Sequence, residues 1–141
     1  MMLYKATSGV GINRYMTFDG VGTYKLHTSG ANWTEAVRTC LHENAYLAIV
    51  NSKAESYVLQ ALMKWFMSSG DFAYLGFHDR EEEGKYRTVF GLPLSYTGFE
   101  TWTDGYPVGT NTFNCGCIHR SGGLCDHICN ASIPFICEKF D

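Results

Sequence analysis

The sequence has no long apolar segment and no strong excess of charge of one sign. No stretch reaches the ~18 consecutive apolar residues that indicate a membrane-spanning helix, so we expect no membrane span. The net charge of −3 argues against a polybasic surface for nucleic acid or for anionic membranes. The start of the chain also lacks a sustained apolar run, which predicts that any signal peptide has been removed.

Catalytic signatures are missing as well. The sequence contains no Gly-x-Ser-x-Gly motif, no His-Glu-x-x-His motif and no phosphate-binding glycine loop. Two Gly-x-Gly fragments occur, but Arg14 and Lys25 stand where a dinucleotide-binding loop has its third glycine. The neighbouring acids Glu81 and Glu82 are interpreted as surface charge rather than as a general acid and base. We therefore predict a protein that is not an enzyme and that has no cofactor.

Cysteine and glycine, by contrast, are plentiful. The six cysteines form an even, clustered set in a turn-rich chain with 15 glycines, which favours disulfides and an oxidising compartment. Six cysteines allow fifteen connectivities, and spacing alone does not choose among them. The triplets Asn32-Trp-Thr34 and Asn130-Ala-Ser132 are glycosylation sequons, which are compatible with secretion. These features predict a secreted, disulfide-bonded domain.

Hydrophobic periodicity predicts two helices. Asn32-Trp-Thr-Glu35 has the form of a capping box with Asn as the cap, and apolar residues follow at helical spacing. The first helix is therefore predicted over residues Trp33–Glu43. Ser52-Lys-Ala-Glu55 is a second capping box, and the apolar face that follows it predicts a helix that continues to about Ser68.

Short apolar runs predict strands, most of which follow the helices. Residues 1–22 are interpreted as an N-terminal arm and residues 23–141 as one domain. Residues 91–114 form a turn-rich loop, and loops of this length inside a compact domain are usually functional. Two helices followed by strands around a long loop indicate an α+β fold. The predicted strands are Tyr24–His27, Tyr46–Val50, Tyr74–Phe77, Tyr86–Val89, Cys115–His119, Leu124–Ile128 and Phe135–Lys139.

Landmark residues recur in a characteristic order from about Tyr24 to Glu138. They are Trp33-x-Glu-Ala-x-x-x-Cys40, Leu47-Ala-Ile49, Tyr74-Leu-Gly-Phe77, Trp102-x-x-Gly105-x-Pro107, Cys115 and Pro134-Phe-Ile-Cys-Glu138. Together they resemble the C-type lectin-like domain. Segments such as Tyr24-Lys-Leu-His-Thr28 and Gly76-Phe-His-Asp-Arg80 further resemble insect hemolymph lectins of the immulectin or lipopolysaccharide-binding type. The resemblance implies a C-type lectin-like fold, with two helices packed on antiparallel strands beside a long loop region.

The resemblance also implies two disulfides. In the family, a cysteine of the first helix pairs with one in the final strand, and a second pair joins the strand after the long loop to the segment before the final strand. The two remaining cysteines lie on opposite arms of a predicted hairpin, where cross-strand neighbours are close to disulfide geometry. The predicted bridges are Cys40–Cys137, Cys115–Cys129 and Cys117–Cys125.

A zinc site is the alternative for this part of the chain. Cys115-x-Cys-x-His119 and Cys125-x-His-x-Cys129 are near mirror images, and side chains two residues apart share one face of a strand. Four of these groups would suit tetrahedral zinc. An oxidising compartment would consume the thiolates, so we prefer the disulfides and interpret His119 and His127 as ordinary strand residues.

The calcium and sugar positions of the family are altered in this sequence. Calcium requires six to eight oxygen ligands. The first ligand motif reads Tyr106-Pro-Val108, the later acid falls near Phe113, and the last motif reads Leu124-Cys-Asp126. Of these ligand positions only Asp126 keeps a suitable side-chain oxygen. The resemblance therefore implies a degenerate calcium and sugar site, and we expect binding that is independent of calcium.

The family also has an accessory calcium position, which maps onto the turn Asp79-x-x-x-Glu83. Both acids are present, whereas Gly109 and Asn114 occupy the positions of the other ligands. A weak calcium ion at Asp79 and Glu83 is one interpretation of this turn. A solvated acidic turn is the other, and it is the one that we prefer.

The resemblance implies a secreted recognition protein of arthropod innate immunity that binds a microbial glycan or lipopolysaccharide. The alternative is a calcium-independent protein-binding effector, such as a venom or parasite-derived factor, that uses the fold as a scaffold. Lys85 and Arg87, with Arg120, are candidate contacts for phosphate groups. The predicted ligand-binding residues are Tyr106, Asn111, Phe113, Asn114, Arg120 and Asp126, for which loop packing is the competing interpretation.

Overall fold

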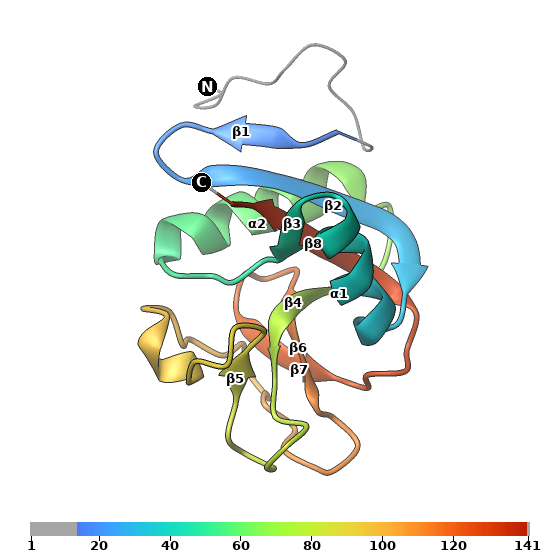
Figure 1. Cartoon of the computed structure of the whole chain (residues 1–141), viewed down its shortest axis with the longest axis vertical. Coiled ribbons are helices and arrows are strands. Elements are labelled where there is room, and N and C mark those ends of the chain that lie inside the picture. Colours follow the sequence, from blue (N-terminus) through green and yellow to red (C-terminus); the bar gives the residue numbers. More distant parts are fainter. Residues whose placement is uncertain (1–13, 141) are drawn as a thin grey trace.

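The computed structural model describes residues 14–140, so most of the predicted N-terminal arm lies outside the described residues. The described part is an α+β domain with two helices and one sheet, as predicted (Figure 1). In chain order the elements are β1 (Met16–Phe18), β2 (Gly22–Ala31), α1 (Trp33–His42), β3 (Ala45–Leu47), α2 (Lys53–Phe66), β4 (Phe72–His78), β5 (Arg87–Thr88), the 3-10 helix η1 (Leu94–Tyr96), β6 (Cys115–His119), β7 (Leu124–His127) and β8 (Ile133–Lys139).

Both helices begin at the predicted capping boxes. The side chain of Asn32 accepts a hydrogen bond from the backbone N–H of Glu35 at 2.9 Å. Ser52 Oγ accepts one from the N–H of Glu55 at 3.0 Å. Each cap satisfies a backbone donor that the first turn of a helix leaves without a partner. Within residues 14–140, neither helix is long and apolar enough to cross a membrane.

The strand order in the sheet is β1-β2-β8-β4-β6-β7, with β3 paired to β8 and β5 paired to β4. The central strand β8 runs antiparallel to β2 and β3 and parallel to β4. Because successive side chains of a strand point to opposite faces, Ile136 packs in the cluster that contains α2, while Phe135 and Cys137 pack in the cluster that contains α1. The two helices therefore cover opposite faces of the sheet (Figure 1).

Strand β1 was not predicted. It lies within residues 1–22, the predicted arm, and pairs antiparallel with β2. Met16 and Phe18 are buried in the main core, where the Phe18 ring lies 6.2 Å from that of Tyr24. A run of three residues is too short to show a strand period in the sequence, which explains why the prediction missed it.

Three disulfides fasten the domain. They are Cys40–Cys137, which joins α1 to β8, Cys115–Cys129, which joins β6 to the segment before β8, and Cys117–Cys125, which joins paired positions of β6 and β7. The first closes a separation of 97 residues, and closing a loop near that length contributes about 4.7 kcal/mol in the chain-entropy model. The thiols that the zinc alternative requires are thus all in disulfides.

Two buried carboxyl groups meet beneath the start of α2. Glu55 accepts hydrogen bonds from the hydroxyl of Tyr24 and, at 2.6 Å, from the backbone N–H of Asn51. Glu138 accepts one from the N–H of Ile49 at 3.2 Å. Burial, and then the neighbouring Glu55 carboxylate, raise the pKa of Glu138 to about 8. The pair therefore holds a proton at neutral pH.

This raised pKa predicts a stability that depends on pH. The folded state holds the proton of Glu138 more tightly than the unfolded state, so stability is lost as the pH rises from the ordinary value of 4.5 through about 8. The side chain of Glu138→Gln stays neutral at every pH. We expect this substitution to raise the free energy of unfolding by on the order of 2 kcal/mol at pH 9 and to change that free energy little at pH 5. Thermal unfolding at both pH values measures this.

Glu100→Gln, which neutralises an exposed acid of the long loop, is the matched control and should behave like the wild type at both pH values. Equal pH dependence in the wild type and in Glu138→Gln would show that the buried pair does not retain a proton.

Candidate functional site

The long loop, residues 91–114, is fixed to the sheet along its length. Leu94 in η1 is buried in the main core. Trp102 forms a bridge with Leu124 of β7, and its ring lies 5.8 Å from that of Phe77 and 5.0 Å from that of Tyr86. The loop is thus an ordered part of the domain, which brings distant residues together.

Asp126 holds the second half of this loop. Its side chain is completely buried, and its Oδ1 accepts a hydrogen bond from the backbone N–H of Val108 at 2.8 Å. Its Oδ2 accepts one from the N–H of Gly109 at 3.0 Å and a longer one from the hydroxyl of Tyr86 at 3.4 Å. Both carboxylate oxygens, the last suitable ones at the family's sugar-bridging position, are therefore used to hold the protein's own backbone.

Two of the predicted ligand-binding residues join a cluster of rings that we term the aromatic–histidine face, formed by Phe72, Tyr106, Phe113, His119 and His127. The Phe72 ring lies 6.0 Å from that of Tyr106, 5.3 Å from that of His119 and 5.0 Å from that of His127. The Phe113 ring lies 6.4 Å from that of His127. All five side chains are partly exposed, so this face presents aromatic and imidazole surface to solvent.

The sequence interpretation missed Phe72, His119 and His127 as members of this face. His119 and His127 were interpreted as ordinary strand residues. The sequence did indicate that the two histidines share a surface. Side chains alternate between the two faces along β6 and β7, which places each histidine on the strand face that also carries the Cys117–Cys125 bridge. The position of β4 beside β6 could not be read from that alternation.

The two asparagines among the predicted ligand-binding residues differ in whether their side chains are free to contact a ligand. The side-chain amide of Asn114 donates to the backbone carbonyl of Asn111 at 2.5 Å, and the carbonyl of Asn114 accepts from the N–H of Asp79 at 3.0 Å. Asn114 therefore helps to shape the loop. Asn111 is exposed at its tip.

Arg120 lies at the C-terminal end of α2. Its guanidinium donates to the carbonyl of Gly70 at 2.9 Å, of Met67 at 3.1 Å and of Met63 at 3.4 Å. A cation at this end also interacts favourably with the helix dipole. Arg120 thus has a clear structural role: it directly follows His119 of the aromatic–histidine face, but its guanidinium is bonded to the carbonyls at the end of α2.

The two other predicted phosphate contacts lie around β5. Lys85 pairs with Glu82 at 3.0 Å, and the Arg87 guanidinium donates to the carbonyl of Gly91 at 3.4 Å. Both line a hollow of about 290 Å³ with Leu94, and Arg120 is not part of that lining. The structure therefore brings Lys85 and Arg87 to one groove and places Arg120 in another.

The accessory calcium position is better formed than the sequence indicated. Asp79 is only 2% exposed, so the preferred interpretation of a solvated turn is wrong for this residue. Its Oδ2 accepts from the N–H of Gly84 at 2.7 Å, whereas its Oδ1 is buried with no hydrogen-bond partner among residues 14–140. Loss of hydration, and then the carboxylates of Asp79 and Asp126, raise the pKa of the exposed Glu83. Such crowded carboxylates suit a hard cation.

The sugar-bridging position, by contrast, lacks the oxygen ligands that a calcium ion needs. Tyr106, Val108, Phe113 and Cys125 supply no carboxylate or amide oxygen there, and Asp126 is committed to backbone donors. Calcium needs six to eight oxygen ligands, so the residues present do not fit a bridging ion.

Comparison with known proteins decides the family. Residues 29–139 match the profile of the Lectin C-type domain. The chain belongs to the C-type lectin family. Domains of this class bind ligands and do not catalyse reactions, as the missing catalytic motifs had indicated.

Two curated relatives of this lectin domain are longer proteins. The hemolymph lipopolysaccharide-binding protein of Periplaneta americana is 40% identical over 126 residues, which are 84% of this chain and 49% of that protein. The C-type lectin domain family 4 member M protein of Hylobates lar is 32% identical over 123 residues, which are 87% of this chain and 30% of that protein. The chain thus spans about half or less of the curated relatives that it matches.

Solved structures agree on the fold. The carbohydrate-recognition domain of the mouse scavenger receptor C-type lectin superposes with a TM-score of 0.76 at 21% identity, covering 89% of this chain and 92% of that one. The recognition of a C-type lectin-like domain from sequence landmarks is therefore confirmed.

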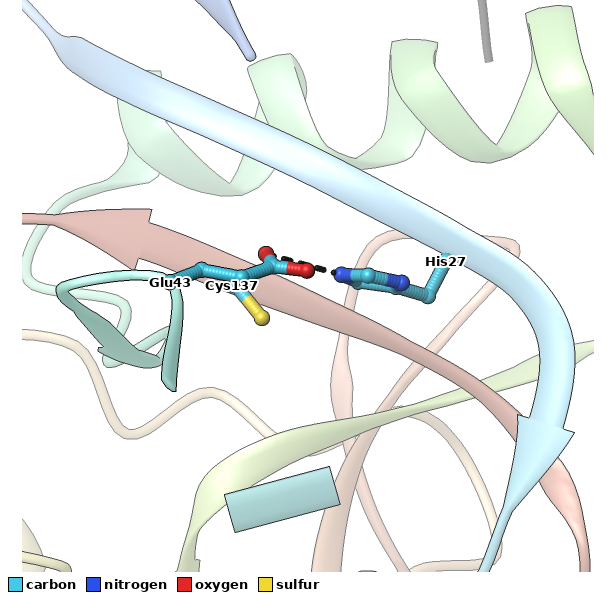
Figure 2. A group of neighbouring side chains, drawn as sticks. All are labelled: His27, Glu43 and Cys137. Atoms are coloured by element: carbon cyan, nitrogen blue, oxygen red, sulfur yellow. Dashed lines mark hydrogen bonds and ion pairs between the residues drawn. The ribbon is translucent and has the colours of Figure 1, made fainter. Parts of the chain in front are cut away.

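One further group in the lectin domain has the residue types of a metal site: His27, Glu43 and Cys137 (Figure 2). Glu43 Oε1 lies 3.1 Å from His27 Nε2 and accepts a hydrogen bond from the Tyr15 hydroxyl at 2.7 Å. The sulfur of Cys137 is bonded to Cys40. Burial lowers the pKa of His27, which favours a neutral ring. The group is a hydrogen-bonded junction between β2 and the end of α1 rather than a metal site.

The role of Asp126 gives a direct prediction. Asp126→Asn replaces one acceptor oxygen by a donor NH₂ group, so one backbone N–H of the loop loses its partner. We expect a loss of about 1–3 kcal/mol in the free energy of unfolding and faster amide exchange at Val108 and Gly109. Hydrogen–deuterium exchange with mass spectrometry measures the second effect.

Asp104→Asn, which alters an exposed acid of the same loop, is the control and should leave exchange at both amides unchanged. Unaltered exchange in Asp126→Asn would contradict the anchoring role of this carboxylate.

Proposed function

We propose that this C-type lectin domain is a secreted recognition protein that binds microbial glycan or lipopolysaccharide without a bridging calcium ion. The relative from Periplaneta americana is named for binding lipopolysaccharide and for its presence in hemolymph, and it supports both the ligand class and the extracellular location. The three disulfides also support secretion, because such bonds persist in oxidising compartments.

One observation carries the calcium-independent mode. Both oxygens of Asp126 accept hydrogen bonds from the loop backbone at 2.8 Å and 3.0 Å, so the loop is held in place by protein groups. In lectins that bridge sugar through calcium, this position supplies a ligand to the ion. Here the same carboxylate satisfies two N–H donors, and charge-assisted hydrogen bonds of this kind are roughly twice as strong as neutral ones.

The aromatic–histidine face supplies a binding surface that suits this mode. Tyr106 and Phe113 stand where binding members carry calcium-liganding groups, which makes the surface more apolar and less negative. Aromatic rings offer large contact areas with a polar edge, and pockets for ligands combine such apolar area with a few polar groups. The lower negative charge favours the approach of an anionic ligand such as lipid A.

A protein ligand is the second candidate function. Phe90, Leu92 and Tyr96 are large apolar residues that are exposed on and beside η1. The Phe90 ring lies 5.2 Å from that of Tyr46 and 6.2 Å from that of Phe140, and Leu92 and Tyr96 line one hollow with Phe90, so these residues form a continuous apolar surface. Contiguous exposed apolar surface of this kind is typical of protein interaction sites.

The binding mode predicts the effect of one substitution. Tyr106→Ala should weaken binding to immobilised lipopolysaccharide at least tenfold, because the loss of an aromatic anchor at an interface hot spot costs about 2 kcal/mol. A chelator should have little effect on the wild type. Surface plasmon resonance measures both quantities.

Tyr96→Ala serves as the control for lipopolysaccharide, since Tyr96 is an exposed tyrosine outside the aromatic–histidine face. If Tyr96→Ala instead abolishes capture of a hemolymph protein while lipopolysaccharide does not bind, the protein-binding alternative holds. Binding that a chelator abolishes and Tyr106→Ala leaves intact would overturn the calcium-independent mode.

The donor sets predict how calcium itself binds. We propose that only the accessory position takes calcium, through Asp79 and Glu83, and that it does so weakly, in the range of about 10⁻⁴–10⁻³ M. Calorimetric titration with calcium should show no site with a micromolar dissociation constant. Asp79→Asn should abolish the heat signal of the weak binding. A low-micromolar dissociation constant that Asp126→Ala abolishes would mean that the bridging site is functional.

A further inference from the structure

A groove lies between α2 and the base of the long loop, and it has other lining residues than the aromatic–histidine face, although the Ser121 hydroxyl of its lining lies 2.9 Å from Nδ1 of His119. Its volume is about 520 Å³, within the size range of ligand sites. One wall is α2, and the other consists of residues 101–104 with the hairpin turn 121–123. A second hollow of about 480 Å³ shares Tyr57 and Gln60 with the groove and continues along α2 to Lys64 and Arg120. The two form one continuous surface along the helix.

The helix wall follows from spacing in the sequence. Lys53, Tyr57, Gln60 and Lys64 are separated by four, three and four residues, so they lie on one face of α2. At 1.5 Å per residue this stripe is about 16 Å long. It is polar along its whole length, with an aromatic ring in the middle and an ammonium group at each end.

Two glycines on the opposite wall of the groove leave it without side chains at these positions. Gly122 has a φ of +105°, and a Cβ atom there would lie 2.8 Å from Gln60 Oε1. A Cβ atom at Gly123 would lie 2.5 Å from the backbone nitrogen of Thr103. Both positions therefore require glycine, which leaves backbone groups and the paired hydroxyls of Thr103 and Ser121, 2.7 Å apart, along this side of the groove.

The lining has groups that remain available for a ligand. Tyr57 is 58% exposed, and its ring makes no stacking contact with another ring within residues 14–140. The amide of Gln60 is partly buried and has no hydrogen-bond partner in the described part of the chain. Sugar rings present C–H faces to aromatic rings and hydroxyls to amides, so an aromatic platform beside a free amide and hydroxyl groups suits a saccharide.

The charges indicate an anionic ligand. Neither Lys53 nor Lys64 has a carboxylate within ion-pair distance among residues 14–140. Arg120 adds a third positive charge next to Lys64, although its guanidinium is also bonded to the carbonyls of Gly70 and Met67 and lies 3.9 Å from the carboxylate of Asp71. Asp104 is the acid in the lining, and it lies in the loop wall away from the hollow that contains Lys64 and Arg120. The Lys64 end therefore suits a phosphate group.

We propose that this groove is a separate site for a phosphorylated oligosaccharide, with Tyr57 as the platform for a sugar ring, Gln60 as a hydrogen-bonding group and Lys64 as the phosphate contact. The inference extends the proposed function, because it assigns the saccharide part of a glycoconjugate to a surface other than the aromatic–histidine face.

The test uses delipidated, phosphorylated core oligosaccharide of lipopolysaccharide, and the same oligosaccharide after chemical removal of its phosphates. Titration of isotope-labelled wild-type protein, followed by NMR, should shift the amide signals of residues 57–64 and 121–123. Tyr57→Ala should weaken binding at least tenfold. Dephosphorylation should weaken binding to the wild type at least fivefold and should have no further effect on Lys64→Gln.

Two controls separate this site from the first one. Tyr106→Ala and Tyr96→Ala should bind the core oligosaccharide as the wild type does. The groove site would be contradicted if intact lipopolysaccharide binds but its core oligosaccharide does not. It would also be contradicted if only Tyr106→Ala removes core binding. Either result would leave the proposed function unaffected. Shifts at residues 57–64 that an unphosphorylated extended peptide reproduces with equal affinity would mean a peptide groove instead. Absence of binding to both lipopolysaccharide and its core would overturn both proposals.

Discussion

Two hydrogen bonds to one buried carboxylate determine how the functional surface of this lectin domain is built. Asp126 lies in β7, and its oxygens accept the N–H groups of Val108 and Gly109 across the turn of the long loop. A buried charge is costly unless polar donors surround it, so carboxylate and loop stabilise each other. The loop in turn places Tyr106 against Phe72 and Phe113 near His127. The Asp126 carboxylate therefore holds the loop through backbone donors, and this is the basis of the calcium-independent mode that we propose.

The last strand has a comparable role for the fold as a whole. β8 pairs with three other strands, separates the two core clusters and carries Cys137, which is bonded to Cys40 of α1. In the same strand, burial and the neighbouring carboxylate of Glu55, at the start of α2, raise the pKa of Glu138 to about 8. Residues at the end of the chain thus fix elements at its beginning, which explains why family landmarks lie at both ends of the domain.

Local signals in the sequence were sufficient for much of this fold. The capping boxes at Asn32 and Ser52 predicted both helix starts, and the order of landmarks predicted the family. Features that depend on contacts between distant segments were not visible. The burial of Asp79, the bonds of Arg120 to the end of α2 and the meeting of Phe72 with His119 all arise from strand order, which no local pattern encodes. The loss of calcium ligands was readable from residue types, whereas the new partners of Asp126 were not, because backbone N–H groups leave no mark in a sequence.

The proposed binding mode depends on Asp126 binding backbone N–H groups rather than calcium. An NMR titration of the isotope-labelled domain with calcium tests this directly through the amide signals of Val108 and Gly109. We predict that both signals stay in place at micromolar calcium, and that the amide of Gly84, which donates to Asp79, moves only at calcium concentrations near millimolar, as the accessory position fills. Saturable shifts of Val108 and Gly109 at micromolar calcium, lost in Asp126→Ala, would contradict the account.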